Sequence, residues 1–132
     1  MFLLDTNICI YAIRQRSAAV LAHLRAHGPA DVGVSAITVA ELQYGVAKSA
    51  RPEANTEALQ LFLAPLEILP FDDAAATAYG RIRADLEGRG TPIGAMDLLI
   101  AAHAVSLHAV VVTNNEDEFR RVPGIEVENW TR

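Results

Sequence analysis

The chain has 132 residues, of which 52% are hydrophobic and 20% are charged, and its formal net charge is −5. This length suits one domain with one core, and the composition is too apolar for a disordered chain. The acidic balance excludes a protein that coats nucleic acid through bulk positive charge, but it permits a nuclease whose acids bind metal.

Hydrophobic periodicity predicts short strands that alternate with helices. The expected order is strand Phe2–Leu4, helix Thr6–Arg14, helix Ala18–His27, strand Val32–Ser35, helix Ile37–Lys48, helix Pro52–Leu63, strand Leu66–Leu69, helix Ala74–Glu87, helix Ala95–Leu107, strand Val110–Thr113 and strand Ile125–Val127. This alternation predicts an α/β fold in which helices cover both faces of a parallel sheet. Neither Gly28-Pro29 nor the 88–92 segment is long enough to be a linker, so we expect a single domain over residues 1–132.

Cys9 is the only cysteine, so the chain forms no internal disulfide, and a reducing, cytoplasmic setting fits best. The N-terminus has no basic segment and carries Asp5 where a signal peptide is apolar. No apolar run approaches the roughly 20 residues of a spanning helix, so we expect no membrane association.

Asp5 directly follows a predicted buried strand, and the Thr113-Asn114-Asn115 segment lies at the carboxyl end of another. In parallel sheets, functional sites form at the carboxyl ends of the strands. Asp5 has a second interpretation, because Asp, Thr and Asn are all good helix N-caps.

Two further acids lie within predicted helices and face apolar neighbours. Glu41 has mostly apolar residues three and four positions away; alternatively it lies at the rim of an apolar helix. Asp97 shares its helix face with Ile100 and Ala101; alternatively it compensates the dipole of a helix N-terminus. Acids that face inward are costly unless a cation neutralises them, and oxygen ligands suit Mg²⁺, with Mn²⁺ as a possible substitute.

Five motifs, taken in order, resemble a known family. They are Leu4-Asp5-Thr6-Asn7, Ala40-Glu41-Leu42 with Tyr44-Gly45, Pro92-Ile93-Gly94 with Asp97, Val112-Thr113-Asn114-Asn115 with Glu118-Phe119, and Val122-Pro123-Gly124-Ile125 with Glu128-Asn129-Trp130. Each motif alone is common, but the ordered set, which spans essentially the whole chain, resembles the PIN-domain ribonucleases. Among these it is most similar to the VapC toxins of bacterial VapBC toxin–antitoxin pairs, of the enteric type.

The resemblance implies a three-layer α/β/α sandwich with a central parallel sheet. It implies a Mg²⁺-dependent endoribonuclease whose catalytic and metal-binding acids are Asp5, Glu41 and Asp97. Asp5 and Asp97 would bind the metal, and Glu41 would share it or orient the attacking water.

The family often has a fourth acid two residues after the threonine of the fourth strand, where this sequence has Asn115. Glu118 is the preferred replacement as a metal ligand, and Asp117 is the second choice. We expect Thr6 and Asn7 to hold Asp5 by hydrogen bonds. We expect Thr113, with Asn115 beside it, to support the acid cluster.

The resemblance also implies partners. The RNA substrate would be initiator tRNA, cut in its anticodon stem-loop. A VapB-type antitoxin would lay a C-terminal segment across the active site and pair a basic side chain with the acids. A second copy of the chain would complete a homodimer.

Other features support weaker hypotheses. Phosphate contacts could come from arginines that otherwise belong to solvated faces, namely Arg14, Arg16, Arg81, Arg83 and Arg89. His23 and His27, near a helix C-terminus, are expected at the surface. Two alternative functions are a catalytically silent PIN-like domain that binds RNA or a partner, and an aspartyl-phosphate protein. The second of these lacks the late lysine that it needs, because no lysine follows Lys48.

Overall fold

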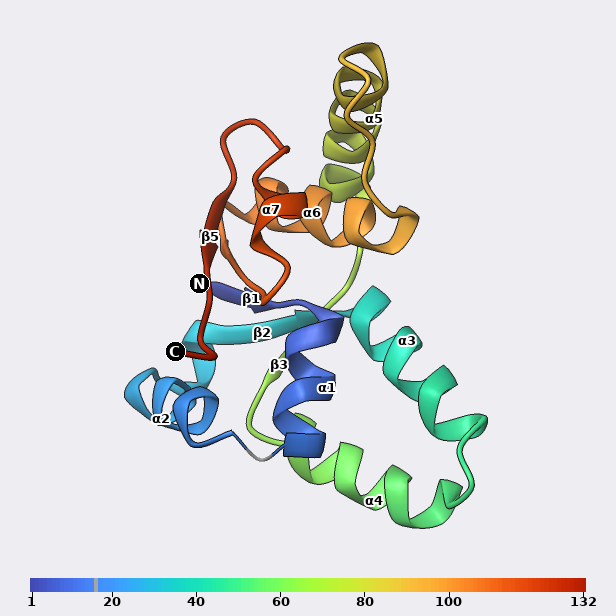
Figure 1. Ribbon diagram of the computed structural model, residues 1–132, viewed down its shortest axis with the longest axis vertical. Helices are drawn as coiled ribbons and strands as arrows, with labels where there is room; N and C mark the ends of the chain where they lie inside the picture. The colour runs from blue at the N-terminus through green and yellow to red at the C-terminus, as the bar shows by residue number, and fades with distance from the viewer. Residues whose placement is uncertain (16) are drawn as a thin grey trace.

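The computed structural model describes residues 1–15 and 17–132. It contains a five-stranded, all-parallel sheet in the order β3-β2-β1-β4-β5, flanked by helices (Figure 1). The strands are β1 (Phe2–Leu4), β2 (Val32–Ser35), β3 (Glu67–Leu69), β4 (Val110–Val112) and β5 (Glu126–Glu128). The helices are α1 (Thr6–Gln15), α2 (Ala18–Ala26), α3 (Ala36–Ala47), α4 (Pro52–Leu63), α5 (Asp73–Gly88), α6 (Ala95–Leu107) and α7 (Glu116–Phe119), with a 3₁₀ turn at Pro29–Asp31. The predicted α/β/α sandwich is confirmed.

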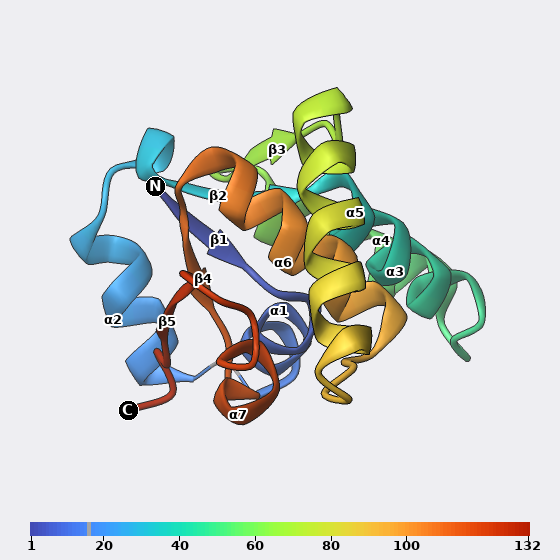
Figure 2. The same cartoon turned by 90° about the horizontal axis from the view of Figure 1, so that it is seen from above.

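Alternate side chains of the central strands point to opposite faces of the sheet and divide the core in two. Leu3 and Val111 face the side covered by α5, α6 and α7. Leu4 and Val112 face the side covered by α1, α2, α3 and α4. Figure 1 shows these two helical layers above and below the sheet, and Figure 2 looks down onto the layer that contains α5 and α6.

The strand order reverses at β1, because the chain builds β2 and β3 on one side of it and β4 on the other. Such a reversal opens a crevice at the carboxyl ends of the neighbouring strands. Asp5 and Thr113 are the first residues after β1 and β4, so the fold brings them together at this crevice.

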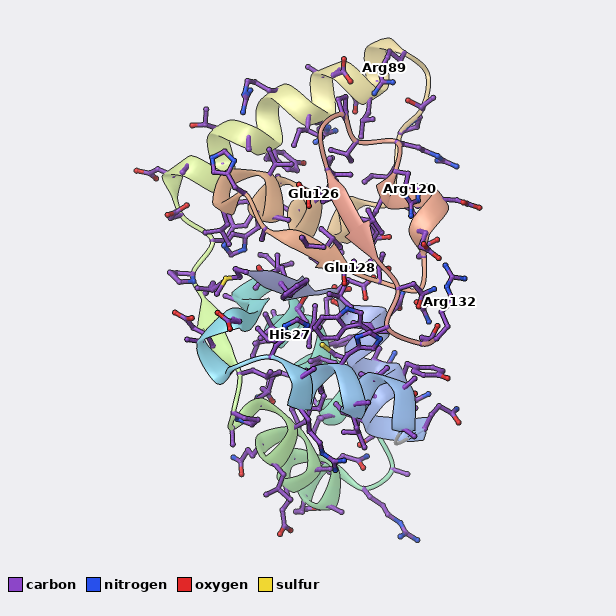
Figure 3. The ribbon with its side chains drawn as sticks, turned by 90° about the vertical axis from the view of Figure 1, so that its left-hand side faces the viewer. His27, Arg89, Arg120, Glu126, Glu128 and Arg132 are labelled. Atoms are coloured by element: carbon purple, nitrogen blue, oxygen red, sulfur yellow. The ribbon has the colours of Figure 1, made fainter. Side chains whose placement is uncertain are left out.

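The predicted helices and strands agree with the structure to within one residue at each end, and the differences at α7 and β5 have identifiable causes. The four-residue helix α7 was not predicted, because four residues are too few to show a helical period. Strand β5 lies one residue later than expected, because its register is set by pairing with β4. It forms the outer edge of the sheet and places Glu126 and Glu128 on the face seen in Figure 3, where charge discourages edge-to-edge association.

Trp130 joins the C-terminal segment to α2. Its side chain is buried and stacks with His23 and His27 at ring-centroid distances of 5.1 and 5.3 Å, and its Nε1 donates to Glu128 Oε1 at 2.9 Å. The two histidines are therefore half-buried packing residues, and the expectation that they lie free on the surface is wrong.

Gly33 is required where β2 passes close to β3. A Cβ at this position would lie 2.9 Å from the backbone oxygen of Glu67. We expect Gly33→Ala to lower the free energy of unfolding by about 1–3 kcal/mol, measured by urea denaturation, because the strands must separate. The matched control is Gly80→Ala in α5, where a Cβ meets nothing within 4 Å and raises helix stability. Equal stability of Gly33→Ala and the wild type would contradict the close approach of the two strands.

Candidate active site

Asp5 is fully buried at the carboxyl end of β1 and makes two different kinds of hydrogen bond. Its Oδ1 accepts the backbone N–H of Ile8 at 2.7 Å, so Asp5 caps α1. Its Oδ2 accepts the hydroxyl of Thr113 at 2.5 Å. Both interpretations of Asp5 are therefore compatible, because one oxygen caps a helix while the other faces the crevice.

Thr113 belongs to a short relay of hydrogen bonds beyond β4. Its hydroxyl donates to Asp5 and accepts the backbone N–H of Asn115 at 2.9 Å. Asn115 in turn donates through Nδ2 to Glu118 Oε2 at 2.6 Å. The segment after β4 thus supports one acid through Thr113 and orients another through Asn115.

Glu41 lies on α3, half-buried, and is held by Thr6. The Thr6 hydroxyl donates to Glu41 Oε1 at 2.6 Å and lies 3.2 Å from the hydroxyl of Thr38. Sequence reasoning expected Thr6 to hold Asp5 instead, and the structure corrects this. Asn7 is exposed, and within the described part of the chain none of the hydrogen bonds to Asp5 comes from it.

Asp97 is half-buried in the first turn of α6 and faces the other acids. Its pKa rises to about 7, first because burial disfavours its charge and then because of repulsion from Glu118, Asp5 and Glu41. The pKa of Asp5 rises to about 6, also mainly through burial, with a smaller contribution from Glu41. The hydrogen bonds from Thr113 and Ile8 oppose this rise. Carboxyl groups from β1, α3 and α6 therefore lie within electrostatic reach of one another.

Glu118 reaches this cluster from α7. Its Oε1 accepts the backbone N–H of Gly94 at 2.6 Å, and this bond is the largest of the effects that lower its pKa. A side-chain hydrogen bond also joins it to Asp97. Asp117, the second choice for a fourth acid, is exposed.

A buried polar contact ties together the helices that carry Glu41 and Asp97. Ser35 caps α3 by accepting the N–H of Ile37 at 3.1 Å, and its Oγ lies 2.8 Å from Nδ1 of His103 on α6. Burial lowers the pKa of His103, so the neutral ring is favoured. This contact fixes α3 and α6 relative to each other below the acids.

The donor set fits a divalent cation. It offers only carboxylate and hydroxyl oxygens, and no ion pair formed by residues 1–15 and 17–132 involves Asp5, Glu41 or Asp97. Within those same residues, no three acid, histidine or cysteine side chains already surround a single ion position. Mg²⁺ does not require three side-chain ligands, because it is commonly bound by one or two carboxylates and completes its coordination shell with water and phosphate.

A groove of about 760 Å³ opens beside Glu41, between α1, α3, α4 and α6. Its lining is largely apolar, with Arg14 and Lys48 among its charged residues. Of the arginines expected to contact phosphate, Arg14 alone lines this groove among the described residues; Arg83 and Arg89 pair with acids on α5, and Arg81 is exposed there. Arg16 lies outside the described residues.

Sequence reasoning missed two supporting groups. Thr38 could have been found, because it precedes Glu41 by three residues and so shares its helix face. The backbone N–H of Gly94 could not, because its partner Glu118 lies 24 residues away in the chain.

The parallel sheet with acids at its carboxyl edge is the architecture of a PIN domain, and residues 2–125 match that family. The protein is 43% identical to Ribonuclease VapC2 of Rickettsia felis, over 100% of this chain and 99% of that protein. It is 42% identical to the tRNA(fMet)-specific endonuclease VapC of Shigella flexneri, over 98% of each chain. The crystal structure of DNA-bound VapBC from Salmonella typhimurium has a TM-score of 0.95 at 43% identity and covers 98% of this chain and 97% of that chain. The chain belongs to the PIN-domain family and, within it, to the VapC ribonucleases.

Ribonucleases of the PIN-domain family generally depend on a divalent metal. None of the helices formed by residues 1–15 and 17–132 is long and apolar enough to cross a lipid bilayer.

Proposed function

We propose that the chain is the toxic endoribonuclease of a toxin–antitoxin pair, that residues 1–132 form a single PIN domain, and that it works in the cytoplasm with Mg²⁺. The observation that carries this proposal is the convergence of Asp5, Glu41 and Asp97 at the switch point of the sheet, where burial and the neighbouring carboxyl groups raise the pKa values of Asp5 and Asp97. An uncompensated acid cluster in a crevice is costly to maintain, and binding a cation offsets that cost.

Asp5 and Asp97 are the residues that would hold Mg²⁺, with Mn²⁺ as a substitute. When bound, the cation supplies Lewis-acid stabilisation of the phosphodiester oxygens during in-line attack by water. Thr113 keeps Oδ2 of Asp5 fixed, and Thr6 keeps Glu41 turned toward the crevice, where its free oxygen can accept a proton or orient water.

The proposed substrate is initiator tRNA, cut in its anticodon stem-loop. The support is a relative that aligns over 98% of this chain and is named a tRNA(fMet)-specific endonuclease. Arg14 and Lys48, along the groove beside Glu41, are the nearest candidates for phosphate contacts.

The proposed protein partners are a VapB-type antitoxin and a second copy of the chain. Solved structures of relatives are VapBC complexes. The apolar groove beside Glu41 would receive the antitoxin segment, and a basic antitoxin side chain would then reach the acids.

The test is to incubate the purified protein with structured RNAs, including initiator tRNA and elongator tRNAs, with Mg²⁺ or with EDTA. We expect one discrete cut in the anticodon stem-loop of initiator tRNA that requires Mg²⁺. RNA binding without any cut, at every Mg²⁺ and Mn²⁺ concentration, would replace this proposal with a catalytically silent RNA-binding domain. Equal cleavage of all tRNAs would overturn the substrate alone.

A further inference from the structure

Helix α6, which carries Asp97 in its first turn, begins without a side-chain cap of its own. Its N-cap is Gly94, which has no side chain. In a capping box, the acid at the third helical position reaches back and accepts the N–H of the N-cap residue. Asp97 occupies that third position.

Glu118 makes that bond in place of Asp97. Its Oε1 accepts the Gly94 N–H at 2.6 Å, the distance of a strong charge-assisted hydrogen bond. Glycine at position 94 leaves room for this approach, because a Cβ there would lie 3.3 Å from Glu118 Oε1 and 3.7 Å from Asp97 Oδ2. The first turn of α6 is thus capped from a different helix.

Glu118 is itself held in place. Its second oxygen, Oε2, accepts Asn115 Nδ2 at 2.6 Å, and Asn115 is anchored through its N–H to Thr113. The next residue, Phe119, is fully buried in the core cluster beneath α6. Each of the two Glu118 oxygens therefore accepts a donor on the protein, which fixes the carboxylate between the start of α6 and the segment after β4.

We propose that Glu118 is a positioning residue, which caps α6 through the Gly94 N–H and thereby spares Asp97 that role, while Asn115 fixes the orientation of Glu118. This inference rests on the proposed nuclease function for its catalytic consequence. It replaces the expectation that Glu118 is a fourth metal ligand, and it explains why an amide at position 115 serves where relatives often have an acid.

The test compares Glu118→Gln, Glu118→Ala and Glu118→Asp. Glutamine keeps the carbonyl oxygen that accepts the Gly94 N–H, and the side chain of Asn115 can turn to present its own oxygen. Alanine removes the acceptor, and aspartate keeps the charge but is one carbon too short to reach. The matched control is Glu116→Gln, which alters another acid of α7 that pairs with Arg120 and Arg132 and not with Gly94.

The first measurement is hydrogen–deuterium exchange of the Gly94 amide in EDTA, which requires neither metal nor activity. We expect exchange to accelerate about 10–100-fold in Glu118→Ala and Glu118→Asp, because each variant loses one charge-assisted hydrogen bond. We expect exchange to stay near the wild-type rate in Glu118→Gln and Glu116→Gln. The second measurement is steady-state cleavage of RNA. We expect kcat to fall about 10–100-fold in the alanine and aspartate variants with KM unchanged, and Glu118→Gln to recover most of kcat.

Two outcomes overturn the inference. One is an unchanged Gly94 exchange rate in Glu118→Ala. The other is a Glu118→Gln variant that protects the Gly94 amide but loses kcat and Mg²⁺ affinity as severely as Glu118→Ala, because this pattern identifies the charge as a metal ligand. If the wild type cleaves no RNA, the proposed function fails while the exchange data still decide the cap. If the wild type cleaves RNA but the Gly94 amide exchanges at the same rate in the wild type and in Glu118→Ala, only this inference fails.

Discussion

We expect that replacing Asp97 with asparagine abolishes RNA cleavage and stabilises the metal-free protein. Activity should fall about a thousandfold or more, because the variant would lose one of the charges proposed to hold the cation that stabilises the transition state. Stability rises because Asp97 is half-buried and is repelled by Glu118, Asp5 and Glu41, and the amide removes that repulsion. Tm in EDTA at pH 8 should rise by a few degrees.

These opposite effects distinguish a functional acid from a structural one. A protein loses stability when an acid that supports its fold is neutralised. Neutralising Asp97 should instead raise the stability of the protein. Glu126→Gln, at the exposed edge strand, is the control of equal charge change and should alter neither activity nor Tm (Figure 3). A folded Asp97→Asn protein with full activity, or with a lower Tm than wild type in EDTA, contradicts the assignment.

We expect the metal-free protein to become less stable as the pH rises from about 4 to 7, and we expect Mg²⁺ to reverse much of this loss. The Asp5 pKa is raised from 3.8 to about 6 by burial, so the folded state binds a proton more tightly than the unfolded state. The stabilisation is complete below pH 3.8 and is lost as the pH rises through about 6. The free energy of unfolding falls by about 1.4 kcal/mol per pH unit between these two values, so Asp5 alone accounts for a loss of about 3 kcal/mol. Asp97 acts in the same direction up to about pH 7.

Urea denaturation at fixed intervals of pH, in EDTA and in Mg²⁺, measures this linkage. Mg²⁺ should stabilise the wild type more at pH 8 than at pH 5, because ligation requires ionised carboxyl groups. Asp5→Asn should flatten the pH dependence in EDTA, although it keeps a side-chain oxygen that can cap α1. A metal-free stability that rises between pH 4 and pH 7 would show that the acids are compensated by some other charge.

Much of this site could be predicted from the sequence, because its main acids follow from local rules. Asp5 directly follows a β-strand, and Glu41 and Asp97 interrupt apolar helix faces, so each of them is visible in its own segment. The supporting contacts were harder to predict. Thr6 bonds Glu41, 35 residues away, although Asp5 is its neighbour in sequence. The direction of a hydroxyl depends on how α1 packs against α3, and no periodicity in the sequence carries that information.

The same limit applies to the elements that no pattern predicted. Helix α7 is too short to be amphipathic, and its boundaries follow from the burial of Phe119 and the contacts of Glu116 and Glu118. The sequence of α2 by itself predicts that His23 and His27 lie at the surface. Trp130, which covers them, is supplied by the opposite end of the chain.

The hydrogen bond between Thr113 and Asp5 joins residues 108 positions apart, and β1 pairs with β4 only after almost the whole chain has been made. During translation, the nascent chain therefore carries Asp5 and Glu41 long before it carries the segment that organises them. A ribosome must extend the chain beyond Thr113 before the crevice can form, so a product that ends before β4 lacks the assembled site.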